Sequence, residues 1–441
     1  MTKDTNKIDE LEKKILSLVD EYTKIRHTKA DFIPGISTVN VNGRVFDENE
    51  LKSLVKASLD FWLTDGEYSE LFSKKLSKFM EMKHIRLVNS GSSANLVALS
   101  ALTSSKLKNY ISDGDKVVTS AVGFPTTVNP IFQNNLIPIF VDSEIGTYNP
   151  TVENIISACD EDTKVIFMAH TLGNPFDVIK LKDFCEDKKI WLLEDNCDAL
   201  GSKIGNTLTG TVGDISTLSF YPAHHITMGE GGAVITNSNK LKLSIDSFRD
   251  WGRDCWCLSG HDDTCNKRFD WQLGELPYGY DHKFTYSNIG YNLKATDLQA
   301  SIGVAQLDKL DEFINLRKEN WKKINNIVNN YKDHLIPHEP SQDSDPSWFG
   351  YAISVKENNK FSRNDFVMFL NENRIATRLM FGGNLVKQPA YAGKKYEVHK
   401  DLVNADYVMN NTFWIGVYPG LDHAAFEYVD DKFQEFFKSF N

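Results

Sequence analysis

The 441-residue sequence predicts an α/β fold in which a mostly parallel sheet is sandwiched by helices. The first observation is a series of short apolar runs, each of strand length, and the second is that helical or polar segments usually separate them. The third is that the runs are continuously apolar rather than alternating, which indicates strands covered on both faces. The runs are Lys116 to Val122, Ile137 to Val141, Val165 to Ala169, Ile190 to Leu193, Ile215 to Phe220 and Ala233 to Thr236.

Residues 1–60 are predicted to form an N-terminal helical arm. A second helix within it is indicated by Asp47, which is followed at Glu50 by a capping-box acid. The first helix carries apolar residues at alternating intervals of three and four, so they share one stripe, and this favours docking on the rest of the chain over recognition of a partner. The stripe consists of Ile8, Leu11, Ile15, Leu18, Tyr22 and Ile25.

Two further regions follow the arm: a large α/β domain at 61–305 and a smaller α+β domain at 306–441. Within the large α/β domain, residues 251–286 form a loop rich in Trp, Cys, Asp and Gly. A loop of this length usually has a function. A helix is predicted from Asp297 to Leu316. The remainder mixes strand-like and helical pieces.

Composition and charge exclude some classes of function. The formal net charge of -11 and a pI near 5.5 leave no basic surplus for nucleic-acid phosphates. The polar N-terminus lacks the apolar core of a signal peptide, and no run of about 18 apolar residues could span a membrane. We therefore expect a cytoplasmic globular enzyme.

Two polar clusters mark the ends of predicted elements. Small hydroxyl residues in Asn89 to Asn95 precede the apolar run Leu96 to Leu102, where free backbone N–H groups and the helix dipole can bind a phosphate. Glu194 and Asp195 close an apolar run at the sheet edge where ligands of α/β folds bind. A carboxylate there could keep a pyridine nitrogen protonated. A plain helix cap and a loop-capping acid are the alternatives.

The segment from Ser219 to Gly232 reads SFYPAHHITMGEGG. It resembles the pattern S-F-x-x-x-K-x-x-x-x-G-E-G-G of the sugar aminotransferase/dehydrase family, which has the aspartate aminotransferase fold. The family's lysine binds pyridoxal 5′-phosphate covalently, and this sequence has His224 in its place. The resemblance extends through Gly91 to Asn95, Gly114-Asp115, His170, Gly173, Pro175, Glu194-Asp195 and Gly290-Tyr291-Asn292.

The resemblance implies a fold-type I pyridoxal phosphate enzyme and gives roles to individual residues. Asp195 would pair with the pyridine nitrogen, and Phe124 would stack on the ring. Asn292 would reach the phosphate of a neighbouring subunit, which implies a homodimer. Asp198 stands where most members carry glutamine, so its contact to the cofactor stays open. The cofactor's phosphate site would consist of Gly91, Ser92, Ser93 and Ser219.

An imidazole at position 224 changes the expected chemistry. It cannot hold the cofactor covalently as an amine does, but it can move a proton near neutral pH. A dehydration that starts from pyridoxamine 5′-phosphate needs such a base. His224 is therefore predicted to be catalytic, and a relative that has lost its activity is the alternative.

Four of the six cysteines form a candidate metal site, with the spacing C-x57-C-x-C-x7-C. Four thiolates can ligate a [2Fe–2S] cluster or zinc, and the spacing alone does not choose between them. Cys197 follows Asp195 by two residues, which would bring a metal close to the cofactor ring, where redox chemistry has a use. The candidate ligands are Cys197, Cys255, Cys257 and Cys265.

This spacing, with histidine in place of lysine, resembles the members of the family that dehydrate C3 of CDP-4-keto-6-deoxyglucose in 3,6-dideoxyhexose biosynthesis. The resemblance implies a CDP-4-keto-6-deoxyhexose substrate, pyridoxamine 5′-phosphate, a [2Fe–2S] cluster and a separate NADH-dependent flavin and iron–sulfur reductase. Two alternatives remain. One is a cluster-free GDP-sugar 3-dehydrase that takes its amino group from glutamate, and the other is a non-catalytic protein with structural zinc in the long loop.

Overall fold

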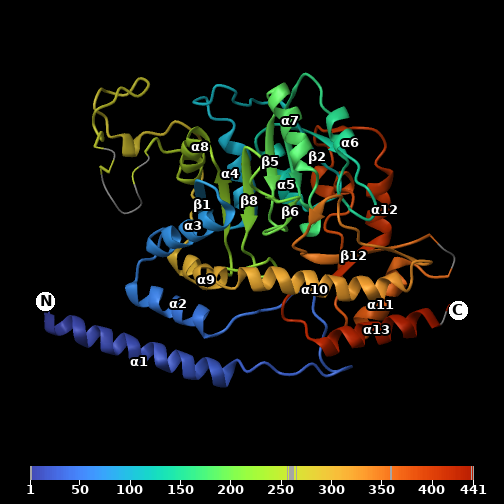
Figure 1. The fold of residues 1–441 in the computed structure, drawn as a ribbon. Coiled ribbons are helices and arrows are strands. Elements are labelled where there is room, and N and C mark those ends of the chain that lie inside the picture. The colour runs from blue at the N-terminus through green and yellow to red at the C-terminus, as the bar shows by residue number, and fades with distance from the viewer. Residues whose placement is uncertain are drawn as a thin grey trace.

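A computed structural model describes residues 2–255, 257, 263–264, 266–357, 360–438 and 440. Its centre is an eight-stranded sheet in the order β1-β9-β8-β5-β4-β2-β3-β14, covered by helices (Figure 1). β9 runs antiparallel to both of its neighbours, and the other neighbouring strands are parallel. The predicted fold class is confirmed.

Six strands of this sheet coincide with the predicted apolar runs, and two do not. β1 was missed because partly buried residues alternate with buried ones along it, so it lacks a continuous apolar run. β14 was missed because it has only two residues, both exposed. The strands are β1 (His84–Val88), β2 (Lys116–Ser120), β3 (Ile137–Val141), β4 (Thr163–Ala169), β5 (Trp191–Asp195), β8 (Ile215–Ser219), β9 (Gly232–Thr236) and β14 (Glu397–Val398).

Both faces of the sheet are buried, as continuous hydrophobicity predicts. Val117 of β2 belongs to a core that includes α4 and α8, whereas its neighbour Val118 belongs to a core with α6 and α7. A third core joins α3 and α9 to β1, β8 and β9. The helices of these layers are α3 (Glu67–Met80), α4 (Gly91–Ala101), α5 (Pro125–Gln133), α6 (Val152–Ser157), α7 (Val178–Lys188), α8 (Asn239–Arg249) and α9 (Asp297–Leu307).

The C-terminal part is built on a four-stranded antiparallel sheet, β10-β12-β15-β13, with helices packed on it. Its elements are α10 (Leu310–Asn329), β10 (Leu335–Pro337), β12 (Gly350–Val355), α11 (Arg363–Glu372), β13 (Arg378–Leu379), α12 (Val403–Asn411), β15 (Thr412–Gly416) and α13 (His423–Lys438). A small sheet combines β6 (Lys203–Ile204), β7 (Thr207–Leu208) and β11 (Ser344–Asp345). Short 3-10 turns occupy Thr171–Gly173, His282–Phe284, Leu385–Lys387 and Pro389–Tyr391.

The helix predicted from Asp297 to Leu316 is two helices, because α9 ends at Leu307 and α10 begins at Leu310. At the break, Lys309 Nζ lies 2.7 Å from a carboxylate oxygen of Glu50. Glu50 belongs to α2 (Glu48–Asp60), whose predicted capping box with Asp47 is present. The ion pair therefore joins the N-terminal arm to the turn between the two helices.

The N-terminal stripe forms on a helix, α1 (Thr2–Arg26), but the docking prediction is wrong about which side docks. The side that faces α2 carries Leu16, Val19 and the buried Thr23, and ion pairs join Asp20 to Lys52 and Glu12 to Lys56 on that side. The stripe residues Ile8 to Ile25 are exposed. The helical spacing of apolar residues could not show which side of α1 docks, because both the stripe and the side that faces α2 carry apolar residues.

Within the described ranges, no helix combines the length and apolar character that crossing a membrane requires.

Candidate active site

Asp195 ends β5 at the carboxyl edge of the central sheet and is buried. Its Oδ2 accepts hydrogen bonds from Asn95 Nδ2 at 2.8 Å and Thr127 Oγ1 at 2.6 Å. Thr217 Oγ1 in turn donates to Asn95 Oδ1 at 2.6 Å, which orients the Asn95 amide. Neither Asn95 as a carboxylate ligand nor Thr127 was predicted. The other oxygen, Oδ1, accepts the backbone N–H of Cys197 at 3.2 Å, so both oxygens of the Asp195 carboxylate are held in place.

The predicted phosphate site lies beside this carboxylate. Ser219 ends β8, and α4 begins at Gly91 with Ser92 exposed. A Cβ at position 91 would lie 2.5 Å from Ser219 Cβ and 3.1 Å from Cys197 Sγ, so glycine lets the helix N-terminus approach both. Ser93 donates its backbone N–H to Ser90 Oγ at 3.1 Å. The N-terminus of a helix of this length can bind an anion through its remaining free N–H groups, and the phosphate site stays a prediction.

Phe124 and Asn292 were also predicted to touch the cofactor. Phe124 caps α5, is half exposed, and lies edge-on to Phe381 with 5.9 Å between ring centroids. Asn292 is exposed and pairs with Asp250 at the base of the long loop, so within this protomer it faces outward. Its role in a neighbouring subunit stays a prediction.

Glu194 faces away from Asp195 and has a structural role. It is fully buried and accepts hydrogen bonds from His170 Nε2 at 3.0 Å and from the backbone of Gly210 at 2.7 Å and Gly213 at 2.6 Å. Burial acts to raise the pKa of Glu194, but these donors outweigh it and hold the pKa below its ordinary value. Of the two predicted carboxylates, only Asp195 belongs to the candidate site.

His224 lies on the loop after β8, with its Nδ1 3.5 Å from Asp198 Oδ1. Burial, together with the positive charge of Arg317, lowers the pKa of His224 to about 3. The imidazole is therefore neutral near pH 7, the form that can accept a proton. Burial and the nearby Asp195 charge raise the pKa of Asp198 to about 8. Asp198 therefore lies beside the imidazole, although His224 Nδ1 forms no hydrogen bond with the described residues.

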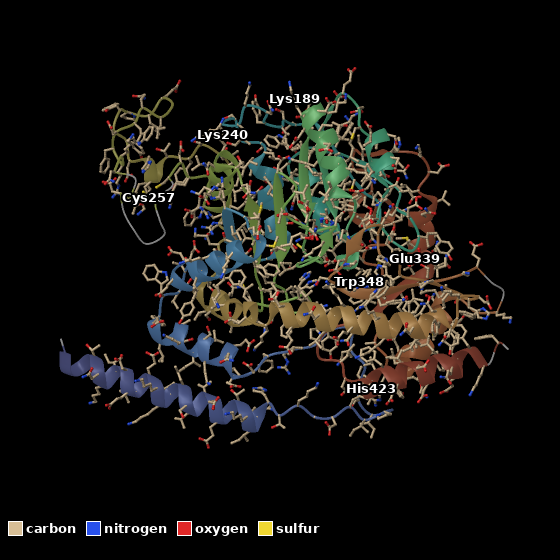
Figure 2. All side chains as sticks on the ribbon, in the orientation of Figure 1. Lys189, Lys240, Cys257, Glu339, Trp348 and His423 are labelled. Atoms are coloured by element: carbon tan, nitrogen blue, oxygen red, sulfur yellow. The ribbon has the colours of Figure 1, made fainter. Side chains whose placement is uncertain are left out.

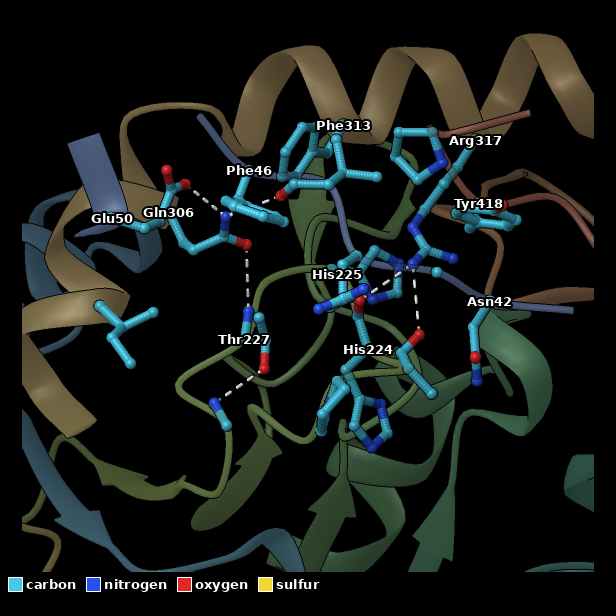
Figure 3. A pocket seen from close by; sticks show the side chains of 18 of the residues that line it. Asn42, Phe46, Glu50, His224, His225, Thr227, Gln306, Phe313, Arg317 and Tyr418 are labelled. Carbon is cyan, nitrogen blue, oxygen red and sulfur yellow. Dashed lines mark hydrogen bonds between the residues drawn. The ribbon is translucent and has the colours of Figure 1, made fainter. Parts of the chain in front are cut away.

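Arg317 is a site component that sequence reasoning missed. It is buried on α10, and its Nη2 donates to the carbonyl of His224 at 2.9 Å and of Ala223 at 3.3 Å, while Nη1 donates to the carbonyls of Trp348 and Phe349. Figure 3 shows the guanidinium reaching this loop while the His224 ring points away from it, toward the strands. Arg317 therefore fixes the main chain that carries the candidate base.

Of the predicted metal ligands that the structure describes, Cys255 and Cys257 lie together and Cys197 does not join them. Cys255 Sγ lies 3.6 Å from His282 Nε2, and these two residues and Cys257 place their ligand atoms within 4.8 Å of one another. Cys197 instead lies at the sheet edge beside Gly91, and Cys265 lies outside the described residues. Figure 2 shows Cys257 on the projecting loop, apart from the layered body. His282 was not predicted.

Residues 45–434 of this chain match the family model of the DegT/DnrJ/EryC1/StrS aminotransferase family. The chain belongs to this family. It is 50% identical to the lipopolysaccharide biosynthesis protein RfbH of Salmonella typhimurium, with 97% of this chain and 98% of that protein aligned. It is 46% identical to the dTDP-4-dehydro-2,6-dideoxy-D-glucose 3-dehydratase of Saccharopolyspora spinosa, over 98% of this chain and 93% of that protein.

The fold of the chain also resembles that of solved structures of similar enzymes. The E. coli GDP-4-keto-6-deoxy-D-mannose-3-dehydratase with bound hydrated PLP superposes with a TM-score of 0.80 at 27% identity, covering 90% of this chain and 99% of that chain. Pyridoxal phosphate chemistry is thus supported by both the family and a structural neighbour. The residues present fit such a cofactor, since a buried, hydrogen-bonded carboxylate and a helix N-terminus opened by Gly91 lie side by side.

Proposed function

We propose that this chain dehydrates C3 of a nucleotide-linked 4-keto-6-deoxyhexose with the help of pyridoxamine 5′-phosphate. The observation that carries the proposal is the position of His224: an imidazole stands where the family has its lysine, in a site that keeps the Asp195 network. A family member without the lysine can still transfer protons but cannot hold the cofactor through a covalent bond. Relatives that are named as 3-dehydratases support the same reaction.

Bound in this site, the cofactor would supply an amine for the 4-keto group and a ring that accepts electrons. Asp195 keeps the pyridine nitrogen protonated, and Phe124 bounds one face of the ring. His224 takes a proton from C4′ as the hydroxyl leaves C3. Arg317 fixes the main chain that carries that imidazole, and Asp198 lies 3.5 Å from its Nδ1. The α4 N-terminus holds the phosphate through Ser92, Ser93 and Ser219, with Asn292 of a second subunit in a homodimer.

The proposal also names a nucleotide and a pathway. The sequence resemblance implies CDP, whereas the names of relatives contain dTDP and GDP. The name of the Salmonella relative refers to lipopolysaccharide biosynthesis. We therefore propose that the product serves 3,6-dideoxysugar formation for lipopolysaccharide O-antigen, with CDP as the first nucleotide to test.

Replacing the C3 hydroxyl by hydrogen consumes two electrons, and two sources are possible. One is the [2Fe–2S] cluster with its NADH-dependent reductase. The other is an amino donor such as glutamate, and this second function is favoured because Cys197 lies beside Gly91 and does not belong to the group that Cys255, Cys257 and His282 form among the described residues. One solved dehydratase of the GDP-sugar class has a trapped PLP-glutamate adduct.

The experiment that tests the proposed function is product analysis with CDP-4-keto-6-deoxyglucose, pyridoxamine 5′-phosphate and either electron source. A 3-deoxy-4-keto sugar is the expected product with at least one source. The source that supports turnover identifies which of the two routes operates. A 4-amino sugar as the main product with glutamate would show an aminotransferase and contradict the proposal.

The predicted [2Fe–2S] site can be tested with variants of Cys257, Cys197 and Cys185, which all lie in the described part of the chain. Cys257→Ser should lower the iron content of anaerobically purified protein and bleach its visible absorption, because Cys255, Cys257 and His282 already place three ligand atoms together. Cys185→Ser is the matched control, because this buried thiol lies in α7 and should leave iron unchanged. Cys197→Ser then reports whether the sheet-edge thiol shares the same metal. Zinc in place of iron would contradict the cluster.

A further inference from the structure

The exposed stripe of α1 has the strict spacing of a coiled coil. Its six residues alternate at intervals of three and four over almost the whole helix, which defines positions a and d of consecutive heptads. Their exposed fractions are high for apolar side chains that share one helix face. They are Ile8 61%, Leu11 49%, Ile15 37%, Leu18 65%, Tyr22 59% and Ile25 75%.

The stripe is separate from the side of α1 that packs within the protomer. At about 100° per residue, Leu16 and Thr23 lie roughly a third of a turn away from the centre of the stripe, whereas Val19 lies about a fifth of a turn away, at its margin. That side is already covered by α2 and is fixed by the Asp20–Lys52 and Glu12–Lys56 ion pairs. Docking on the protomer therefore leaves the heptad seam available, as Figure 1 shows for a helix lying along the edge of the molecule.

The residue types in the seam select a particular partner. Ile8 and Ile15 occupy a positions and Leu11 and Leu18 occupy d positions, and isoleucine at a with leucine at d favours two parallel strands. A self-pairing parallel helix places each seam residue opposite its own copy. The partner with the matching seam is thus a second copy of this chain.

The flanking charges agree with this parallel arrangement. In a parallel pair, position g of one helix faces position e of the next heptad in the other helix. Glu21 would face Arg26, a pair of opposite charge, and Lys7 would face Glu12, whose carboxylate already pairs with Lys56 of its own protomer at 3.8 Å. The third g–e pair joins Lys14 to the apolar Val19, so no pair of like charges occurs.

We propose that α1 pairs with α1 of a second copy of this chain as a parallel two-stranded coiled coil. The pairing would tether two protomers through their N-terminal arms, independently of any contact that completes the candidate active site. The proposed pairing depends on the six stripe residues and on the charged residues beside them at positions e and g. It does not depend on the proposed function.

The test is site-directed disulfide cross-linking of the full chain. Leu18→Cys places a thiol at a d position, so two copies should form a disulfide-linked dimer under mild oxidation, because residue 18 of each helix faces residue 18 of the other. Lys13→Cys, on the outer side of the same helix, is the matched control and should give several-fold less cross-linked dimer, as should the wild-type chain. Equal cross-linking of Leu18→Cys and Lys13→Cys would overturn the proposal.

Two further measurements distinguish the arrangement. Adding Glu21→Lys to Leu18→Cys should slow cross-linking, and adding Arg26→Glu as well should restore it, because the pair is then reversed rather than lost and neither residue takes part in the ion pairs to α2. A lack of restoration would contradict the g–e pairing. Efficient cross-linking only when Leu11→Cys is mixed with Tyr22→Cys would show an antiparallel pair and would also overturn the proposal.

Discussion

His224→Lys should give a protein that holds pyridoxal 5′-phosphate covalently and loses most of its dehydrase activity. The new amine would lie where the family's lysine lies, and the burial and Arg317 charge that lower the pKa of His224 would also favour a neutral, reactive amine there. We expect turnover to fall by about 10²-fold or more, the usual contribution of a positioned general base. Borohydride reduction followed by intact-protein mass measurement should show one fixed cofactor per chain.

His224→Asn is the control for this experiment, because it removes the base without adding an amine. It should lose activity as His224→Lys does, but it should fix no cofactor beyond the background from surface lysines. Covalent cofactor on the wild-type chain at the level of the lysine variant would contradict the role given to His224.

Asp195→Asn should keep the fold and lose turnover by roughly 10²- to 10³-fold, the cost typical of removing one preorganised electrostatic group. An amide cannot keep the pyridine nitrogen protonated, so the ring would accept electrons poorly. Asparagine keeps one oxygen for the donors Asn95 and Thr127, which should preserve the local packing. Steady-state kinetics together with a thermal melt separates the chemical effect from unfolding.

Thr127→Val is the matched control for Asp195. It removes one hydrogen bond to the carboxylate at 2.6 Å but leaves the charge, so turnover should fall far less than in Asp195→Asn. Near-native turnover of Asp195→Asn would mean that another group faces the pyridine nitrogen.

Much of the fold follows from the sequence because the central strands are covered on both faces. A short, continuously apolar run between turn signals is typical of a buried strand, and six such runs form strands of the central sheet. The edge strand β14 lacks this signal because Glu397 and Val398 are both exposed. The break at Asp308 and Lys309 was missed because no Gly or Pro marks it, and the Lys309–Glu50 contact found there joins residues far apart in the chain.

The candidate site was only partly predictable for a similar reason. Asp195 and His224 stand in local motifs, whereas Asn95 and Thr127 contact Asp195 only after three segments meet at the sheet edge. Arg317 did carry a signal, because it falls on the buried stripe of α10 with Phe313, Ile314 and Trp321. A charged residue on such a stripe must find polar partners, and here they are main-chain carbonyls.

The measurement that tests the central claim most directly is exchange of the C3 oxygen of CDP-4-keto-6-deoxyglucose with ¹⁸O-labelled water. The chain is supplied with pyridoxamine 5′-phosphate but with neither reductant nor amino donor, so that dehydration can reverse. Fragment masses distinguish C3 from C4, whose carbonyl oxygen exchanges without enzyme. The wild-type chain should incorporate label at C3, and His224→Asn should not. Absence of label at C3 with the wild-type chain, together with a 4-amino sugar as the product, would contradict the assignment as a 3-dehydrase.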